Sequence, residues 1–329
     1  AGPDKNDFHV RRLRFQVDGY LYENVDFKFE FHADRLRTVG MKDAWAGFKK
    51  YPFLRFRVGQ FKSPFSRQRV TSSSKLQLIE RSLVQVFYPG RDIGVEISGK
   101  NLAGLFDYGF SVLGGAGDSL KYQDTDNGNF VFLGRFAFHP LGGIPFSEGD
   151  IKESDKVKVE LAGSALLAPS QIAFGEKSSN NIFNSFAAYG VTTLDAMPLG
   201  RTLIYGGEFS LRYKGFSFTA EGYYATFSPN SSEVGKITGT RRNLSSYGVF
   251  GQAGYFIIPG MFELAARYEQ VDIDRDVINS DDIKAITGGL NYFVKKNHKY
   301  KIQFNFIREI RRGAFEDSNI AMLNAQVKY

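Results

Sequence analysis

The basic side chains of one polar segment, residues 61–90, are the strongest functional candidates in this sequence. The segment holds a single acid, Glu80, against a larger group of cations. Charged side chains at a narrow point of a channel decide which ions pass, and cations there lower the barrier for anions. If the segment lies in a channel, Lys62, Arg67, Arg69, Lys75 and Arg81 would line a path for small anionic or neutral solutes.

Basic residues of two predicted strands extend this group. Successive side chains of a strand point to opposite faces, so Arg12 and Arg14 share one face, as do Arg55 and Arg57. We expect these four to continue the basic path along the interior of the protein. The same alternation also turns acids inward, which leaves open that many of these charges only pair with each other. The inward acids include Asp26, Glu30, Glu96, Glu160, Glu208, Glu221, Glu263 and Glu269.

Other kinds of chemistry have little support. The chain has no cysteine, which excludes thiolate metal sites and cysteine nucleophiles. Its four histidines are far apart without metal-ligand spacing, and no Gly-x-Ser-x-Gly turn occurs. The formal charge of +7 could attract nucleic acid, but the basic residues alternate with apolar ones inside strands. We expect no enzymatic activity, no cofactor, no metal and no nucleic-acid partner.

The elements that position these residues are predicted from hydrophobic alternation. Apolar and polar residues alternate with a period of two along most of the chain, which indicates strands with one apolar and one polar face. Lengths of around ten residues suit a tilted transmembrane strand. Outward phenylalanines are expected to face lipid. The predicted strands are 8–22, 25–34, 38–50, 53–61, 91–100, 104–115, 129–139, 155–167, 201–213, 215–228, 244–258, 261–273, 282–295, 299–311 and 318–329.

The connections between these strands alternate between short turns and longer polar loops, as expected for an outer-membrane barrel. One exception is 140–154, a long connection on the side of the short turns. Closed bacterial barrels usually have an even number of strands, whereas fifteen are visible. We therefore expect a sixteenth strand upstream of Ala1, or a hidden one within 183–196. The fold class is all-β: one transmembrane antiparallel β-barrel domain, residues 1–329, of about 16 strands.

The segment from Leu54 to Lys100 resembles the phosphate-selective porin O and P family. The resemblance implies a trimeric, sixteen-stranded outer-membrane porin whose third loop, 61–90 here, folds into the lumen and narrows it. Beyond that loop the family's phosphate-binding lysines and arginines are not matched, so phosphate selectivity itself is not implied. The stretches that carry the resemblance are Arg57 to Phe65, Thr71 to Ser73, Glu80 to Leu83, Pro89 to Val95, Arg11 to Arg14 and Lys42 to Ala44.

The expected function is passive diffusion of small hydrophilic solutes across the bacterial outer membrane, with a preference for anions such as phosphate. The expected partners are small anionic or neutral solutes, outer-membrane lipid and two further copies of the chain. One alternative is a scaffold barrel that holds a partner protein in the membrane. A less favoured alternative is an outer-membrane enzyme, since barrels can carry catalytic sites.

Overall fold

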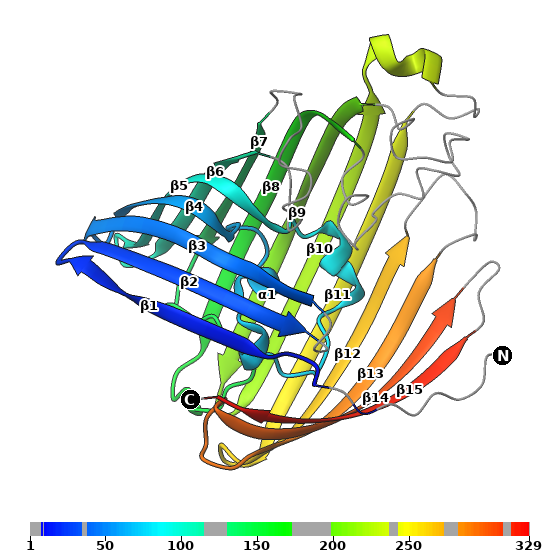
Figure 1. The fold of residues 1–329 in the computed structure, drawn as a ribbon. Coiled ribbons are helices and arrows are strands. Elements are labelled where there is room, and N and C mark those ends of the chain that lie inside the picture. Colours follow the sequence, from blue (N-terminus) through cyan, green and yellow to red (C-terminus); the bar gives the residue numbers. More distant parts are fainter. Residues whose placement is uncertain are drawn as a thin grey trace.

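The described residues form a single antiparallel sheet of fifteen strands, each paired with its neighbours in sequence (Figure 1). The computed structural model describes residues 8, 10–34, 38–114, 130–172, 199–236, 243–272, 282–311 and 317–328. The strands are β1 (Arg14–Tyr22), β2 (Val25–Asp34), β3 (Thr38–Tyr51), β4 (Leu54–Lys62), β5 (Arg91–Leu102), β6 (Phe106–Leu113), β7 (Val131–Phe138), β8 (Lys158–Ile172), β9 (Leu199–Tyr213), β10 (Phe216–Pro229), β11 (Leu244–Ile258), β12 (Phe262–Asp272), β13 (Ile283–Phe293), β14 (Tyr300–Arg311) and β15 (Ser318–Val327).

The sheet is apolar on its outer face and polar on its inner face, as in a membrane barrel. On β12, Leu264 and Tyr268 are 44% and 47% exposed on the outer face, whereas Glu263 and Arg267 are buried on the inner face. Such a strand suits an apolar solvent outside and a polar interior. Among the described residues, no helix is long and apolar enough to cross a membrane.

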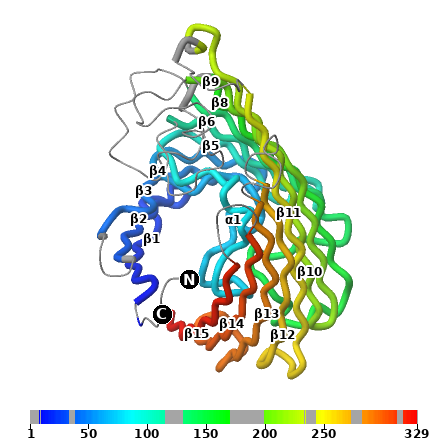
Figure 2. Tube along the Cα trace, turned by 90° about the vertical axis from the view of Figure 1, so that its right-hand side faces the viewer, coloured from blue at the N-terminus to red at the C-terminus, as the bar shows by residue number. Residues whose placement is uncertain are grey.

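Each of the fifteen predicted ranges overlaps one strand, which confirms the alternation, although β8 runs five residues beyond its predicted end at 167. The first strand begins later than expected, at Arg14 rather than residue 8. The sheet curls around an interior, with β1 and β15 at its two edges (Figure 2). These two strands do not pair with each other within the described part of the chain, so the sheet is not closed there. Residues 183–196 and any strand upstream of Ala1 lie outside the described residues.

Two connections fold into this interior from opposite rims. Residues 63–90 follow β4 and carry α1 (Arg67–Val70) and two short 3₁₀ turns, η1 (Ser73–Lys75) and η2 (Leu83–Phe87). Between η1 and η2, residues 76–82 are not helical. Residues 139–157 follow β7 from the rim of the short turns. The apolar core lies where the first segment packs against the sheet, with Phe61, Phe65 and Phe87 fully buried.

Candidate functional site

Residues 63–90 begin with a short helix whose N-terminus is bound by side chains of β8 to β10. The N–H groups at a helix start have no partner within the helix. Here the Arg67 N–H donates to Glu208 at 2.9 Å and the Gln68 N–H to Glu221 at 2.7 Å. The Ser66 hydroxyl donates to Glu221 at 2.6 Å and accepts from the Arg69 N–H at 3.0 Å. The first turn of α1 is thus fixed against two buried carboxylates.

The rest of the segment is held by its backbone against β12 to β14. The Ile79 N–H donates to the Asn305 side chain at 2.7 Å, and the Leu83 N–H donates to Glu269 at 2.6 Å. In the other direction, the Lys301 ammonium donates to the Leu76 carbonyl at 2.6 Å. Buried backbone groups need such partners, and here the sheet supplies them. We call the inner face of β8 to β14 the anchoring wall.

Close packing reinforces these hydrogen bonds. A Cβ at Gly254 of β11 would lie 1.8 Å from Nε2 of Gln77, and one at Gly248 would lie 2.6 Å from the Phe87 ring. Only residues without a side chain permit this approach, since Cβ atoms do not come so close to other heavy atoms. The segment therefore lies directly on the sheet at β11, without space for a solute between them.

Residues 139–157 meet the first segment inside the protein. The Glu148 N–H donates to the Lys75 carbonyl at 2.8 Å, and the Glu148 carboxylate accepts from the Gln77 N–H at 2.7 Å and from Gln252 at 3.0 Å. Arg212 of β9 also donates to the Ser147 carbonyl. The two segments enter from opposite rims and form one joined layer over the anchoring wall.

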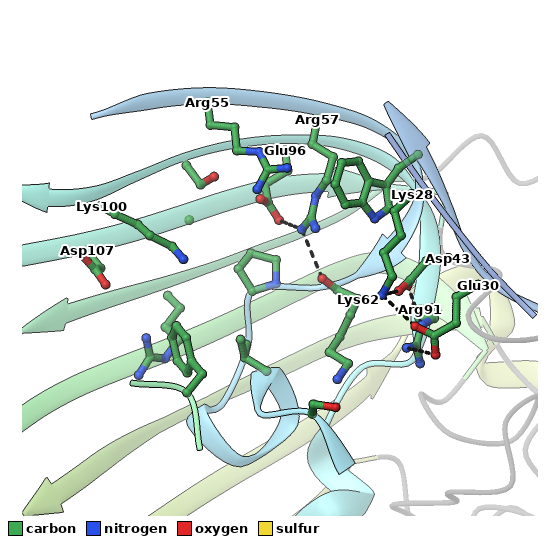
Figure 3. Close-up of a pocket in the computed structure, with 18 of the residues that line it drawn as sticks. Lys28, Glu30, Asp43, Arg55, Arg57, Lys62, Arg91, Glu96, Lys100 and Asp107 are labelled. Atoms are coloured by element: carbon green, nitrogen blue, oxygen red, sulfur yellow. Dashed lines mark hydrogen bonds and ion pairs between the residues drawn. The ribbon is translucent and has the colours of Figure 1, made fainter. Parts of the chain in front are cut away.

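An open cavity of about 400 Å³ remains on the other side of this layer. Strands β1 to β6 form its far side, and we call their inner face the cavity wall. Figure 3 shows the side chains of Arg55, Arg57 and Lys28 reaching into this space from the strands, with Lys62, at the end of β4, beside the inserted segment. The cavity is thus bounded by the cavity wall on one side and by parts of the two inserted segments on the other.

Most acids of the cavity wall are paired with neighbouring bases. Asp43 accepts from Lys28 at 2.6 Å and from Arg91 at 2.7 Å. Glu30 accepts from Lys28 at 2.7 Å, and Glu96 accepts from Arg57. Even so, basic residues outnumber acids around the cavity: its acids are Glu30, Asp43, Glu96 and Asp107, and its bases are Arg14, Lys28, Arg55, Arg57, Lys62, Lys75, Arg91, Lys100, Arg135 and Lys328.

Five of the basic residues singled out in the sequence border the cavity, namely Arg14, Arg55, Arg57, Lys62 and Lys75. The other four have different neighbours. The Arg67 guanidinium lies against the anchoring wall, 2.6 Å from both a Glu160 oxygen and the Pro145 carbonyl. The Arg12 guanidinium lies 4.0 Å from the Glu80 carboxylate. The backbone N–H of Arg69 donates to the Ser66 hydroxyl. The Arg81 guanidinium donates to the backbone carbonyls of Gln68 and Thr71.

Burial shifts the titration of two groups within residues 63–90. It lowers the pKa of Arg81, although Glu148 acts in the opposite direction. Burial, aided by the nearby Glu221 carboxylate, raises the pKa of Tyr88 well above its ordinary value. The Tyr88 phenol therefore stays neutral, and its hydroxyl donates a hydrogen bond to the Glu221 carboxylate at 3.0 Å. Both side chains serve to hold the segment in place.

Several cavity residues were not identified from the sequence. Lys28 and Lys100 have the required alternation on β2 and β5, so a signal for them existed. Phe146, and Glu148 of the joined layer outside the cavity, had none, because the interior position of 139–157 depends on tertiary contacts. The described residues contain no group of three or more His, Asp or Glu side chains that could hold a metal ion.

Comparison with known proteins agrees with this architecture. The family model for phosphate-selective porin O and P matches residues 1–328, which confirms the resemblance seen around Leu54 to Lys100. An uncharacterized protein of Aquifex aeolicus (strain VF5) is 26% identical over 343 residues, covering 92% of this chain and 76% of the relative.

Solved structures of outer-membrane proteins share the fold. OmpT of Vibrio cholerae, as a loop L8 deletion mutant, superposes with a TM-score of 0.56 at 11% identity, covering 95% of this chain and 88% of the other. The trimer form of OmpT gives 0.56 at 10% identity, covering 95% and 89%. OprB of Pseudomonas putida gives 0.54 at 10% identity, covering 95% and 85%. At these identities the likeness concerns the fold alone.

Proposed function

Because this chain belongs to the phosphate-selective porin O and P family, we propose that it is an anion-preferring diffusion pore whose solutes pass along the cavity wall. Family membership places the protein in the bacterial outer membrane as a β-barrel porin, which points to a channel rather than an enzyme. The preference for anions and the route through the interior are the proposed parts.

The excess of cations around the cavity carries this proposal. Ten lysines and arginines border it against four aspartates and glutamates, so the paired acids leave a net positive lining. Lys62, Lys75 and Lys100 form no ion pair with a carboxylate among the described residues. A positive lining in a narrow aqueous space attracts anions and repels cations. Solutes would move down their own gradients, without a cofactor.

A working pore also needs a closed wall and a defined assembly. Backbone groups at a sheet edge find no water in the hydrocarbon core of a membrane. We therefore propose that the β1 and β15 edges are joined in the membrane, directly or through a further strand. We also propose a homotrimer, which is the state of one OmpT structure of the same fold. Cross-linking of the protein in outer-membrane vesicles should then give a trimer band.

The ion preference is tested in a planar bilayer under a KCl gradient. The sign of the reversal potential should show that chloride is more permeant than potassium. The double change of Lys62→Glu and Lys75→Glu should lower the chloride-to-potassium permeability ratio roughly tenfold, since it reverses two charges at the cavity. Lys295→Glu makes the same type of change in an exposed turn and should leave the ratio near that of the wild type.

Either of two results would refute this assignment. A potassium-selective wild-type channel would show that the basic lining does not determine selectivity. A total lack of conductance from correctly folded protein would favour the alternative of a scaffold barrel with a blocked interior.

A further inference from the structure

The cavity combines unpaired cations with apolar side chains, a mixture that a simple ion path does not require. Trp45 of β3, Pro64 and Val70 of the first inserted segment, and Phe146 of the second all border it. Solute-binding pockets in proteins are mostly apolar with a few placed polar groups. The cavity therefore has the composition of a binding pocket for a molecule with both an apolar and a charged part.

The size of the cavity also fits a small-molecule binding pocket. Its volume of about 400 Å³ lies within the range of small-molecule pockets, roughly 300 to 1,000 Å³. At about 30 Å³ for each water, it has room for on the order of a dozen waters. A bare inorganic anion occupies only a small part of such a space.

The cations are placed where they can meet the charged end of such a solute. The side chains of Lys62 and Lys100 point into the cavity from different directions (Figure 3). Neither ammonium forms an ion pair with an acid in the described parts of the chain. Carboxylates on the cavity wall are taken up by other bases, as Asp43 is by Lys28 and Arg91. Both lysines are thus without an acidic partner in the described parts of the chain, which leaves them available to an incoming anion.

The apolar side chains are held in place by cations around them. The guanidinium groups of Arg55 and Arg57 lie 5.0 and 5.3 Å from the Trp45 ring. The Phe146 ring lies 5.8 Å from the Lys100 ammonium and 5.5 Å from the Arg135 guanidinium. Such contacts between cations and aromatic rings are attractive. Trp45 and Phe146 therefore both lie beside cations, so one solute can contact apolar and basic groups together.

We propose that the cavity is a binding site for organic anions with an apolar body, such as aromatic sulfonates or carboxylates, and that it prefers them to inorganic anions. This proposal rests on the proposed function in that it takes the cavity to lie on the anion path. Phe146 is then a specificity-determining residue, because it brings an apolar surface from the opposite rim into an otherwise basic space.

The test compares benzenesulfonate with methanesulfonate, which carry the same permanent charge and differ in the apolar body. Trp45 is the only tryptophan in the chain, so its fluorescence reports on the cavity in detergent-solubilised protein. Benzenesulfonate should change the emission saturably, at a half-saturating concentration at least about tenfold below that of methanesulfonate, because burial of the ring is favourable. Equal responses to the two sulfonates, or no saturation, would overturn the proposal.

Three variants test whether Phe146 contributes to the binding of benzenesulfonate. Phe146→Ser should weaken benzenesulfonate binding at least about threefold, whereas Phe146→Leu, which keeps an apolar side chain, should stay close to the wild type. Leu141→Ser is the matched control, since Leu141 is exposed in the same segment and does not border the cavity. If Phe146→Ser and Leu141→Ser have equal effects, Phe146 does not contribute to the site.

The outcomes separate this inference from the proposed function. An anion-selective channel that does not distinguish the two sulfonates would refute the binding site and leave the pore intact. A cation-selective channel that binds benzenesulfonate in the fluorescence assay would refute the anion path and keep the site. Block of the chloride current by benzenesulfonate, but not by methanesulfonate at the same concentration, would support both.

Discussion

The two walls of the interior use similar residues for different purposes. On the anchoring wall, Glu208 and Glu221 accept hydrogen bonds from the backbone of residues 63–90, so their charge is used to hold a segment. On the cavity wall, Glu30 and Asp43 pair with neighbouring bases of the wall itself. One wall supports a layer of inserted chain and the other borders open space. The position of a charge relative to the inserted segments, more than its type, therefore decides its role.

Glu221→Leu should give the largest effect. Its carboxylate accepts from the Ser66 hydroxyl, the Gln68 N–H and the Tyr88 hydroxyl. Each buried group left without a partner costs about 1 to 3 kcal/mol, so the anchored helix should detach. Thermal unfolding should shift to lower temperature and single-channel currents should become noisy.

Glu221→Gln is the control, because an amide oxygen still accepts hydrogen bonds in the same place. It should be clearly milder than Glu221→Leu. Quiet, wild-type currents from Glu221→Leu would show that the anchoring wall does not hold residues 63–90.

The next effect in size is expected from Gly254→Ala. The new Cβ would fall 1.8 Å from Nε2 of Gln77, so the Gln77 side chain must move and give up its hydrogen bonds to Ser217 and Glu263. Overpacking of this kind costs about 1 to 3 kcal/mol. Gly251→Ala on the same strand is a matched control, because its nearest contact would be an ordinary 3.8 Å from the Phe218 ring. Thermal unfolding of both variants measures the difference, and equal midpoints would contradict close packing at Gly254.

Asp43→Asn tests the cavity wall. It should raise the preference for anions, which is the opposite of the effect expected for Lys62→Glu and Lys75→Glu, and by a smaller factor. Removal of this charge leaves Lys28 and Arg91 less neutralised. The chloride-to-potassium permeability ratio should rise by roughly twofold to threefold, as expected for one charge in a hydrated space. The reversal potential provides the measurement. A fall in the ratio would mean that the pairing on this wall does not limit its positive potential.

Lys100→Gln should give the smallest effect. It removes one exposed cation of the cavity wall that has no carboxylate partner in the described chain. The permeability ratio should fall by about twofold or less, because water and salt screen an exposed charge. Thermal stability should not change. A large loss of stability would show that Lys100 has a structural partner instead.

The sequence was sufficient to predict the strands, because each strand repeats the same alternation under the same physical constraint. An apolar face toward lipid and a polar face inward leave a signal at every second residue, as on β12 with Leu264 and Glu263. The start of β1 was placed too early, since the apolar Phe8 and Val10 continue the alternation without being part of the strand.

The site was harder to predict because alternation gives the face of a side chain and not its neighbours. Arg57 and Arg67 have the same chemistry, yet one borders the cavity and the other lies against Glu160. The difference arises from the path of residues 63–90, which is determined by contacts with strands far away in sequence. Phe146 was missed for the same reason: the exceptional length of 140–154 was visible, but not its interior position.

The most direct test of the account asks which wall borders the solute path. Because the chain has no cysteine, single cysteines can be introduced as Lys100→Cys on the cavity wall and as Leu78→Cys on the buried side of the inserted segment, where Leu78 is 1% exposed. In a bilayer, a thiol reagent carrying a sulfonate should react with Lys100→Cys, reduce the current, and do so faster than its ammonium counterpart. Leu78→Cys should remain unmodified. Rapid modification of Leu78→Cys, or faster reaction of Lys100→Cys with the ammonium reagent, would contradict an anion path along the cavity wall.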